Sequence, residues 1–125
     1  MSNYMTNFGD VPVVASVVPV ATFTADANGN AVDMFEYTGE AAVIMQSSAG
    51  TGSMTLNVKL QEADATGGPW TDITGAAFAQ VTLTASTQKI SINTNECKRY
   101  IRGVVDVGGA GPSFIVGVSV LGIQG

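Results

Sequence analysis

Residues 53–62, SMTLNVKLQE, alternate between polar and apolar side chains over their whole length. A period of two places successive side chains on opposite faces of an extended chain, so it predicts a β-strand with one buried face. The face expected in the core consists of Met54, Leu56, Val58 and Leu60. The face expected toward solvent consists of Ser53, Thr55, Asn57, Lys59 and Gln61.

The same period recurs in both directions from this segment. It predicts further long strands at residues 97–107 and 113–121, and shorter strands at 78–83 and 87–93. Residues 41–47 form a continuous apolar run, which favours a central strand. Two less regular β-rich segments lie at 13–24 and 31–38.

Turn sequences separate these runs at short intervals. Asn28-Gly29 favours a type I′ hairpin, because both central residues of that turn need a positive φ. About eight short strands without an amphipathic helix predict an all-β fold. We expect an antiparallel β-sandwich of jelly-roll topology, with an immunoglobulin-like topology as the alternative. No linker or repeat divides the chain, so residues 1–125 are expected to form a single domain.

The N-terminal segment, residues 1–20, has two interpretations. Pro12 and Pro19 cannot donate to a β-ladder, so they suit either an edge strand or an extended arm. An arm would pack on a neighbouring subunit, and the alternative is an ordinary first strand of the sandwich. The interface candidates in this segment are Val13, Val14, Val17 and Val18.

The composition excludes several kinds of function. The 125 residues include no histidine, one cysteine and only 12% charged residues, and the net charge is −5. Without histidine the commonest general base and metal ligand are missing, and one cysteine cannot build an internal disulfide or a cysteine-rich zinc site. So acidic a chain binds nucleic acid or anionic membrane poorly. We therefore expect no enzyme activity, catalytic residue, metal site or cofactor.

The few cations concentrate in residues 98–102, KRYIR. In a strand, Lys98, Tyr100 and Arg102 project from one face, where they could stack on and pair with an acidic partner surface. Between copies, this cluster could meet the acidic N-terminal half of the chain, and the alternative is a solvated outer face. Trp70 follows a Gly-Gly-Pro turn, and it is a candidate either for a glycan platform or for a residue that closes the core.

Several short sequence patterns occur in an order that is similar to that found in a known group of proteins. Leu60-Gln61-Glu62 leads through a glycine-containing turn to Trp70-Thr71-Asp72-Ile73, and then come KRYIR at 98–102 and an apolar strand at 114–121. This order resembles small virion proteins of tailed bacteriophages, which are β-sandwich proteins that decorate or cement the capsid or sit on head or tail surfaces. The resemblance covers roughly residues 54–121, and it implies no catalytic residue.

The resemblance and the composition together predict a structural virion protein. Its expected role is that of a capsid decoration or cement protein that bridges subunits of a phage head, as a homotrimer. The expected partners are the major capsid protein and copies of itself, without nucleic acid or membrane. The N-terminal residues, MSNYMTNFGD, lack the basic and apolar pattern of a secretory signal, so synthesis in the host cytoplasm is expected before the protein joins the capsid surface. The alternatives are a tail-tube or head–tail joining protein, or a carbohydrate-binding module that uses Trp70, Tyr100 and Phe78.

Overall fold

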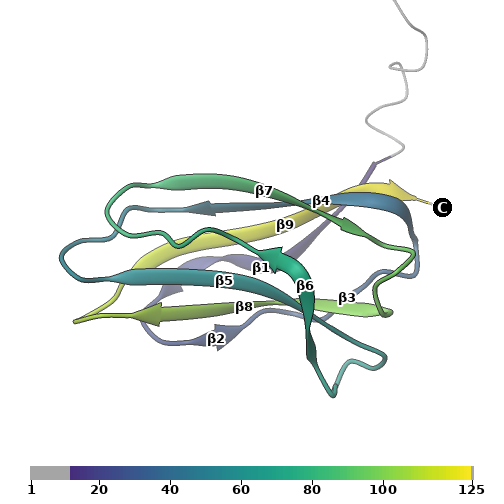
Figure 1. The fold of residues 1–125 in the computed structure, drawn as a ribbon, viewed down its shortest axis with the longest axis horizontal. Coiled ribbons are helices and arrows are strands. Elements are labelled where there is room, and N and C mark those ends of the chain that lie inside the picture. The colour runs from purple at the N-terminus through teal and green to yellow at the C-terminus, as the bar shows by residue number, and fades with distance from the viewer. Residues whose placement is uncertain (1–11, 125) are drawn as a thin grey trace, which may run out of the picture.

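The computed structural model describes residues 12–124, and these residues form strands and loops without a helix. The antiparallel, all-β fold predicted from the alternation is confirmed. Figure 1 shows two layers of strands that face each other. The strands are β1 (Pro12–Phe23), β2 (Ala27–Asn28), β3 (Val32–Asp33), β4 (Tyr37–Ser47), β5 (Thr55–Ala63), β6 (Thr71–Ala77), β7 (Ser86–Asn93), β8 (Tyr100–Gly108) and β9 (Phe114–Gln124).

The strand order identifies the topology. One layer, sheet A, has the order β1-β9-β4-β7, and the other, sheet B, has the order β2-β8-β5-β6, with β3 also paired to β8. The first strand therefore pairs with the last, β2 and β3 pair with β8, β4 pairs with β7, and β5 pairs with β6, always antiparallel. Such nested pairing is that of a long hairpin wound into two sheets, which is a jelly-roll rather than an immunoglobulin-like sandwich.

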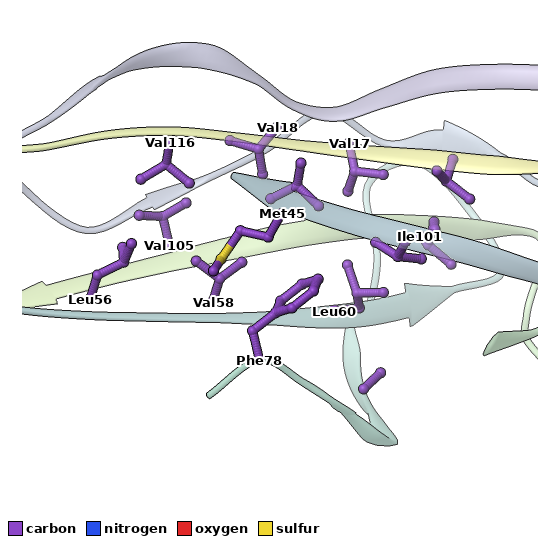
Figure 2. Close-up of a cluster of buried hydrophobic side chains, with 14 of the residues drawn as sticks. Val17, Val18, Met45, Leu56, Val58, Leu60, Phe78, Ile101, Val105 and Val116 are labelled. Carbon is purple, nitrogen blue, oxygen red and sulfur yellow. The ribbon is translucent and has the colours of Figure 1, made fainter. Parts of the chain in front are cut away.

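The core lies between the two sheets, and the side chains in it come from alternate positions of each strand (Figure 2). The predicted apolar face of β5 is buried, with Leu60 fully inaccessible. In β9 the alternate residues from Phe114 to Val120 are fully buried, as the period of two predicted. The apolar run at 41–47 lies in β4, which pairs with β9 on one side and β7 on the other, so it is the central strand predicted.

Residues 12–20 belong to the first strand of sheet A. β1 pairs with β9 over most of its length, with shifts of register after Ser16 and after Val18. A β-bulge at this place lets Val17 and Val18 both point into the core, where they are 0% and 1% exposed (Figure 2). These two valines, expected at an interface if the segment were an arm, thus pack inside their own domain. Residues 1–11 and the side chain of Val13 lie outside the described residues.

The hairpin predicted at Asn28-Gly29 is wrong. The short strands on either side of it, β2 and β3, both pair with β8 and not with each other, and no residue other than glycine has a positive φ in the described part of the chain. Gly29 is needed for a different reason, because its backbone passes directly over β1. A Cβ built on Gly29 would lie 2.1 Å from the carbonyl oxygen of Val17.

One strand was predicted in the wrong place. Residues 78–83 form only an isolated bridge, Val81 with Leu56, while the strand itself is β6 (Thr71–Ala77). After β6 the chain still follows β5 for a few residues, because Phe78 and Val81 donate their N–H groups to the carbonyl oxygens of Val58 and Leu56. It then crosses to sheet A, which interrupts regular pairing.

Candidate functional site

The outer faces of the two sheets differ in charge. The four strands of sheet A hold two charged residues, Glu40 and Lys89. The strands of sheet B are shorter in total, and they hold six: Asp33, Lys59, Glu62, Asp72, Arg102 and Asp106. The low charge of the whole chain is therefore mainly a property of sheet A.

The outer face of sheet A exposes apolar side chains. Val14, Val20 and Ile115 are 66%, 76% and 52% exposed. Val20 lies against Gly117 of β9, since a Cβ at that glycine would come 2.5 Å from its Cγ2 atom. Val20 and Ile115 border a shallow hollow of about 430 Å³ that is otherwise lined mainly by small and hydroxyl side chains such as Ser86. Around Val20 and Ile115 this face can bury apolar area against another protein, and it carries few charges that would have to be desolvated.

Two of the three residues predicted in the basic cluster do share a face. Tyr100 and Arg102 occupy alternate outward positions of β8, and both are half-buried. Lys98 precedes the strand, which begins at Tyr100, and its backbone N–H donates to Glu62 Oε1 at 2.9 Å. Lys98 is thus held at the end of the sandwich next to β5 and does not continue the row of Tyr100 and Arg102.

Arg102 is fixed by an array of side chains that crosses three strands. Its guanidinium lies over the ring of Trp70, 4.6 Å from the centroid, and its Nε and Nη2 donate to Gln61 Oε1 at 3.0 and 2.8 Å. Gln61 Nε2 donates to Asp72 Oδ1 at 2.9 Å, and Lys59 Nζ pairs with Asp72 Oδ2 at 3.0 Å. The hydrogen bond from Gln61, followed by that from Lys59, lowers the pKa of Asp72 below its ordinary value.

This array also bears on Trp70. The ring is half-buried, it is not part of the core cluster, and one of its faces carries the Arg102 guanidinium. Phe78, the third aromatic residue of the predicted carbohydrate site, is 6% exposed and packs in the core (Figure 2). The three aromatic residues therefore do not form one open platform.

A second arginine, Arg99, lies over two aromatic rings. The Arg99 guanidinium lies 5.4 Å from the ring centroid of Phe35 and 5.3 Å from that of Tyr100. Its Nη2 pairs with Asp33 Oδ2 at 2.9 Å. The hydrogen bond from Arg99, followed by the backbone N–H of Phe35, lowers the pKa of Asp33. Arg99 thus has a counter-ion, and its charge is compensated locally.

The carboxylates of Asp26 and Asp106 lie close together toward the C-terminal end of β8, away from Tyr100 and Arg102. The charge of Asp26, which precedes β2, raises the pKa of Asp106 on β8. Asp26 Oδ1 also accepts the backbone N–H of Val107 at 2.9 Å, which fixes its position beside the strand. The two carboxylates border a hollow of about 330 Å³ on the outer face of sheet B.

No protein-family model matches the sequence, and no curated protein sequence matches it significantly. The fold, in contrast, is shared with solved structures. A chain in the structure of infectious bursal disease virus Gt strain aligns with a TM-score of 0.55 at 14% identity, over 93% of this chain and 34% of that chain. A chain of the infectious bursal disease virus VP2 subviral particle aligns with a TM-score of 0.53 at 13% identity, over 93% and 34%.

This chain thus spans about a third of the virus chains that it matches. A chain of the disulfide-linked pili of Bacillus endospore appendages aligns with a TM-score of 0.48 at 14% identity, over 91% of this chain and 88% of that chain. At these identities the likeness to the two virus chains establishes a common β-sandwich fold. The resemblance to tailed-phage proteins stays a prediction.

Three further findings concern metal ligands, membrane-spanning helices and the single thiol. They hold no group of three or more cysteine and acidic side chains that could bind a metal ion. Within residues 12–124, no helix has the length and apolar character that crossing a membrane requires. Cys97 is a free, half-buried thiol, and burial, followed by the charge of Glu62, raises its pKa. A thiol with a raised pKa is a poor nucleophile at neutral pH.

The sequence alone did not reveal Gln61, Asp72, Asp33 or Phe35 as parts of these clusters. Their partners lie 11 to 66 residues away along the chain, on or next to other strands, so only the strand order and register bring them together. The array around Arg102 can be predicted from the sequence once the strand order β8-β5-β6 is known. Arg102, Gln61 and Asp72 then fall in one row across the three strands.

Proposed function

We propose that this chain is a structural protein of a virus particle, which binds the outside of a phage head as a decoration or cement protein and bridges neighbouring capsid subunits. The observation that carries the proposal is the charge-poor outer face of sheet A, on a jelly-roll that is also found in chains of infectious bursal disease virus. Val20 and Ile115 give this face exposed apolar area that a capsid surface would cover.

The mechanism is the burial of apolar area, repeated at each site of the shell. Burial contributes about 25 cal/mol per Å² of apolar surface removed from water. Each contact is therefore modest, but a shell that carries many copies gains the contribution at every one. No catalytic residue, cofactor or metal is needed for this role, and the partners are the major capsid protein and further copies of the chain.

Co-sedimentation with expanded capsids of the matching phage tests the proposal. The purified protein should sediment with the capsids at micromolar concentration and raise their melting temperature. Ile115→Asp places a charge in the proposed contact and should reduce binding, while Leu83→Asp, at a residue that is 61% exposed in the loop between β6 and β7, should leave it unchanged. Absence of binding by the unaltered protein would refute the proposal.

The position in the virion is tested separately by native mass spectrometry. On the shell the expected decoration protein is a homotrimer, which can occupy a threefold position. In solution at high salt, where charged contacts are screened, a trimer or a monomer supports decoration, whereas a hexamer or a tube supports the tail-tube or head–tail joining alternative. Synthesis in the host cytoplasm and a final place on the capsid surface follow from the proposed role, and immunogold labelling of intact particles would test that place.

A further inference from the structure

The outer face of sheet B carries a positive charge at Arg102 and negative charges at Asp26 and Asp106. None of these three charges is compensated by an ion pair within residues 12–124. The two ion pairs among the described residues are Lys59 with Asp72 and Arg99 with Asp33. Arg102 instead contacts a neutral amide oxygen and an indole ring. Its Nε and one N–H of Nη2 are used by Gln61, so the outer edge of the guanidinium is left for another acceptor.

The negative charges of Asp26 and Asp106 lie at a hollow in which neither carboxylate is paired with a cation from the described part of the chain. Asp26 and Asp106 border it, together with the amide side chains of Asn28 and Asn57. The repulsion between the two carboxylates shows in the raised pKa of Asp106. Lys59 also lines the hollow, but its Nζ is engaged by Asp72. A guanidinium that entered the hollow would relieve the repulsion and find several oxygen acceptors.

Arg102 and Asp106 lie at equal distances along β8 on either side of Val104. Arg102, Val104 and Asp106 occupy successive outward positions of β8, and Val104, in the middle, is half-buried and apolar. The arginine and the aspartate are four positions apart, which is about 13 Å in an extended strand. In an isologous pair, residue i contacts residue j and residue j contacts residue i. A two-fold axis through Val104 therefore brings each of the two charges opposite its complement.

We propose that a second copy of this chain packs its own sheet B on this face, with a two-fold axis at Val104, so that Arg102 of each copy enters the Asp26–Asp106 hollow of the other. The apolar Val104 side chains meet at the axis. Tyr100 of each copy then lies opposite Gly108, which has no side chain to obstruct it. Stacking on Trp70 and the bonds to Gln61 hold the guanidinium in place before binding, which reduces the entropy lost on association.

This contact leaves the other surface free. It uses sheet B, while the proposed capsid contact uses the outer face of sheet A, on the opposite side of the sandwich (Figure 1). The inference does not rest on the proposed function, because two copies can pair in solution without a capsid. On a shell, the same contact could link copies that belong to neighbouring trimers.

Sedimentation equilibrium with charge-reversal variants tests the pairing. The unaltered protein should dimerise in 50 mM NaCl, and the dimer should weaken in 500 mM NaCl because the charged contacts are screened. Arg102→Glu and Asp106→Arg should each weaken dimerisation by more than about 30-fold, since each substitution juxtaposes like charges twice in a two-fold dimer. Lys89→Glu and Glu40→Arg make the same charge changes on strands of sheet A, and they should leave the dimer unaltered.

An equimolar mixture of Arg102→Glu and Asp106→Arg tests whether these two residues contact each other between copies. In an equimolar mixture, the introduced glutamate of one chain faces the introduced arginine of the other, and the unchanged Arg102 and Asp106 meet at the second contact. The mixture should therefore form a heterodimer although each variant alone is monomeric. Three results would overturn the proposal: an unaltered protein that is monomeric at about 1 mM in low salt, variants that dimerise normally, or a mixture that stays monomeric while both variants retain native circular dichroism.

Discussion

Gly29→Ala is predicted to destabilise the fold strongly, although the substitution adds a single methyl group. The Cβ would lie 2.1 Å from the carbonyl oxygen of Val17 and 3.0 Å from Cγ2 of Val18. The first contact is with backbone, which cannot rotate away as a side chain can. The same carbonyl accepts the N–H of Asn30 at 3.1 Å, and the N–H of Gly29 donates to Gly103 at 2.7 Å. The added methyl group must therefore displace β1 or break one of these bonds.

The expected size of the effect follows from these two consequences. Forcing an extra methyl group into a packed site costs about 1–3 kcal/mol, and the loss of one buried backbone hydrogen bond costs about 1 kcal/mol more. The free energy of unfolding should thus fall by about 2–4 kcal/mol. For a chain of 125 residues, one kcal/mol corresponds to about 4 °C in melting temperature, so a drop of about 8–16 °C is expected.

Thermal unfolding followed by far-ultraviolet circular dichroism measures this drop, and Gly67→Ala is its control. Gly67 lies in the turn between β5 and β6, its φ is not positive, and a Cβ there would meet no atom within 4 Å. Alanine should therefore leave stability unchanged there or raise it by up to about 1 kcal/mol, because it restricts the unfolded chain. Equal melting temperatures for the two variants would refute the argument that Gly29 is required by close backbone contact.

Three further results are expected. Leu60→Ala, at a fully buried position, should lower the free energy of unfolding in urea by about 2–5 kcal/mol, and a loss below 1 kcal/mol would contradict its place in the core. Arg102→Ala should shift the fluorescence emission of Trp70, the single tryptophan, to longer wavelength at a cost of about 0.5–1 kcal/mol, whereas an unchanged spectrum would mean that the guanidinium does not cover the ring. The pKa values of Asp33 and Asp72 lie below the ordinary 3.8 in the folded state, so their contribution to stability is present above pH 3.8 and is lost as the pH falls through the folded pKa. Melting temperatures measured from pH 7 to pH 2 should fall less steeply at the acidic end for the Asp33→Asn, Asp72→Asn double variant, and identical profiles would exclude these two ion pairs as a source of acid sensitivity.

The sequence predicted the strands whose burial is decided locally. In β5 and β9 each inward position is apolar, so the period of two alone places Leu60 and Phe114 in the core. The period of two is insufficient at β6 (Thr71–Ala77), because Gly75-Ala76-Ala77 has no clear alternation and the pattern favours the more regular residues 78–83. Pairing with β5 decided that strand, and pairing is a property of the folded sheet.

Two other features were hidden because the same residues fit two structures. Adjacent Val17 and Val18 are compatible with a strand of either register, so the bulge that buries both could not be seen in the pattern. Asn28-Gly29 is typical of a hairpin, but Gly29 is required here by contact with Val17, a residue from another strand. In both cases a long-range contact decided a local conformation.

The structure also bears on how copies of this chain can associate. An exposed strand edge offers unpaired backbone groups to a neighbour, and proteins commonly block such edges with proline or a bulge. β1 has both, because Pro19 lacks a donor, the register shifts twice, and the Val17 carbonyl is already occupied by Asn30. Pairing through the edge of β1 is therefore disfavoured, while the outer faces of the two sheets stay accessible.

The two outer faces differ, because one is poor in charge and the other carries complementary charges. The sandwich is therefore suited to association through its faces, and the two kinds of contact should depend differently on salt. Apolar contacts through sheet A should persist in high salt, whereas the two-fold contact through sheet B should weaken, so one salt titration of an assembly distinguishes the two.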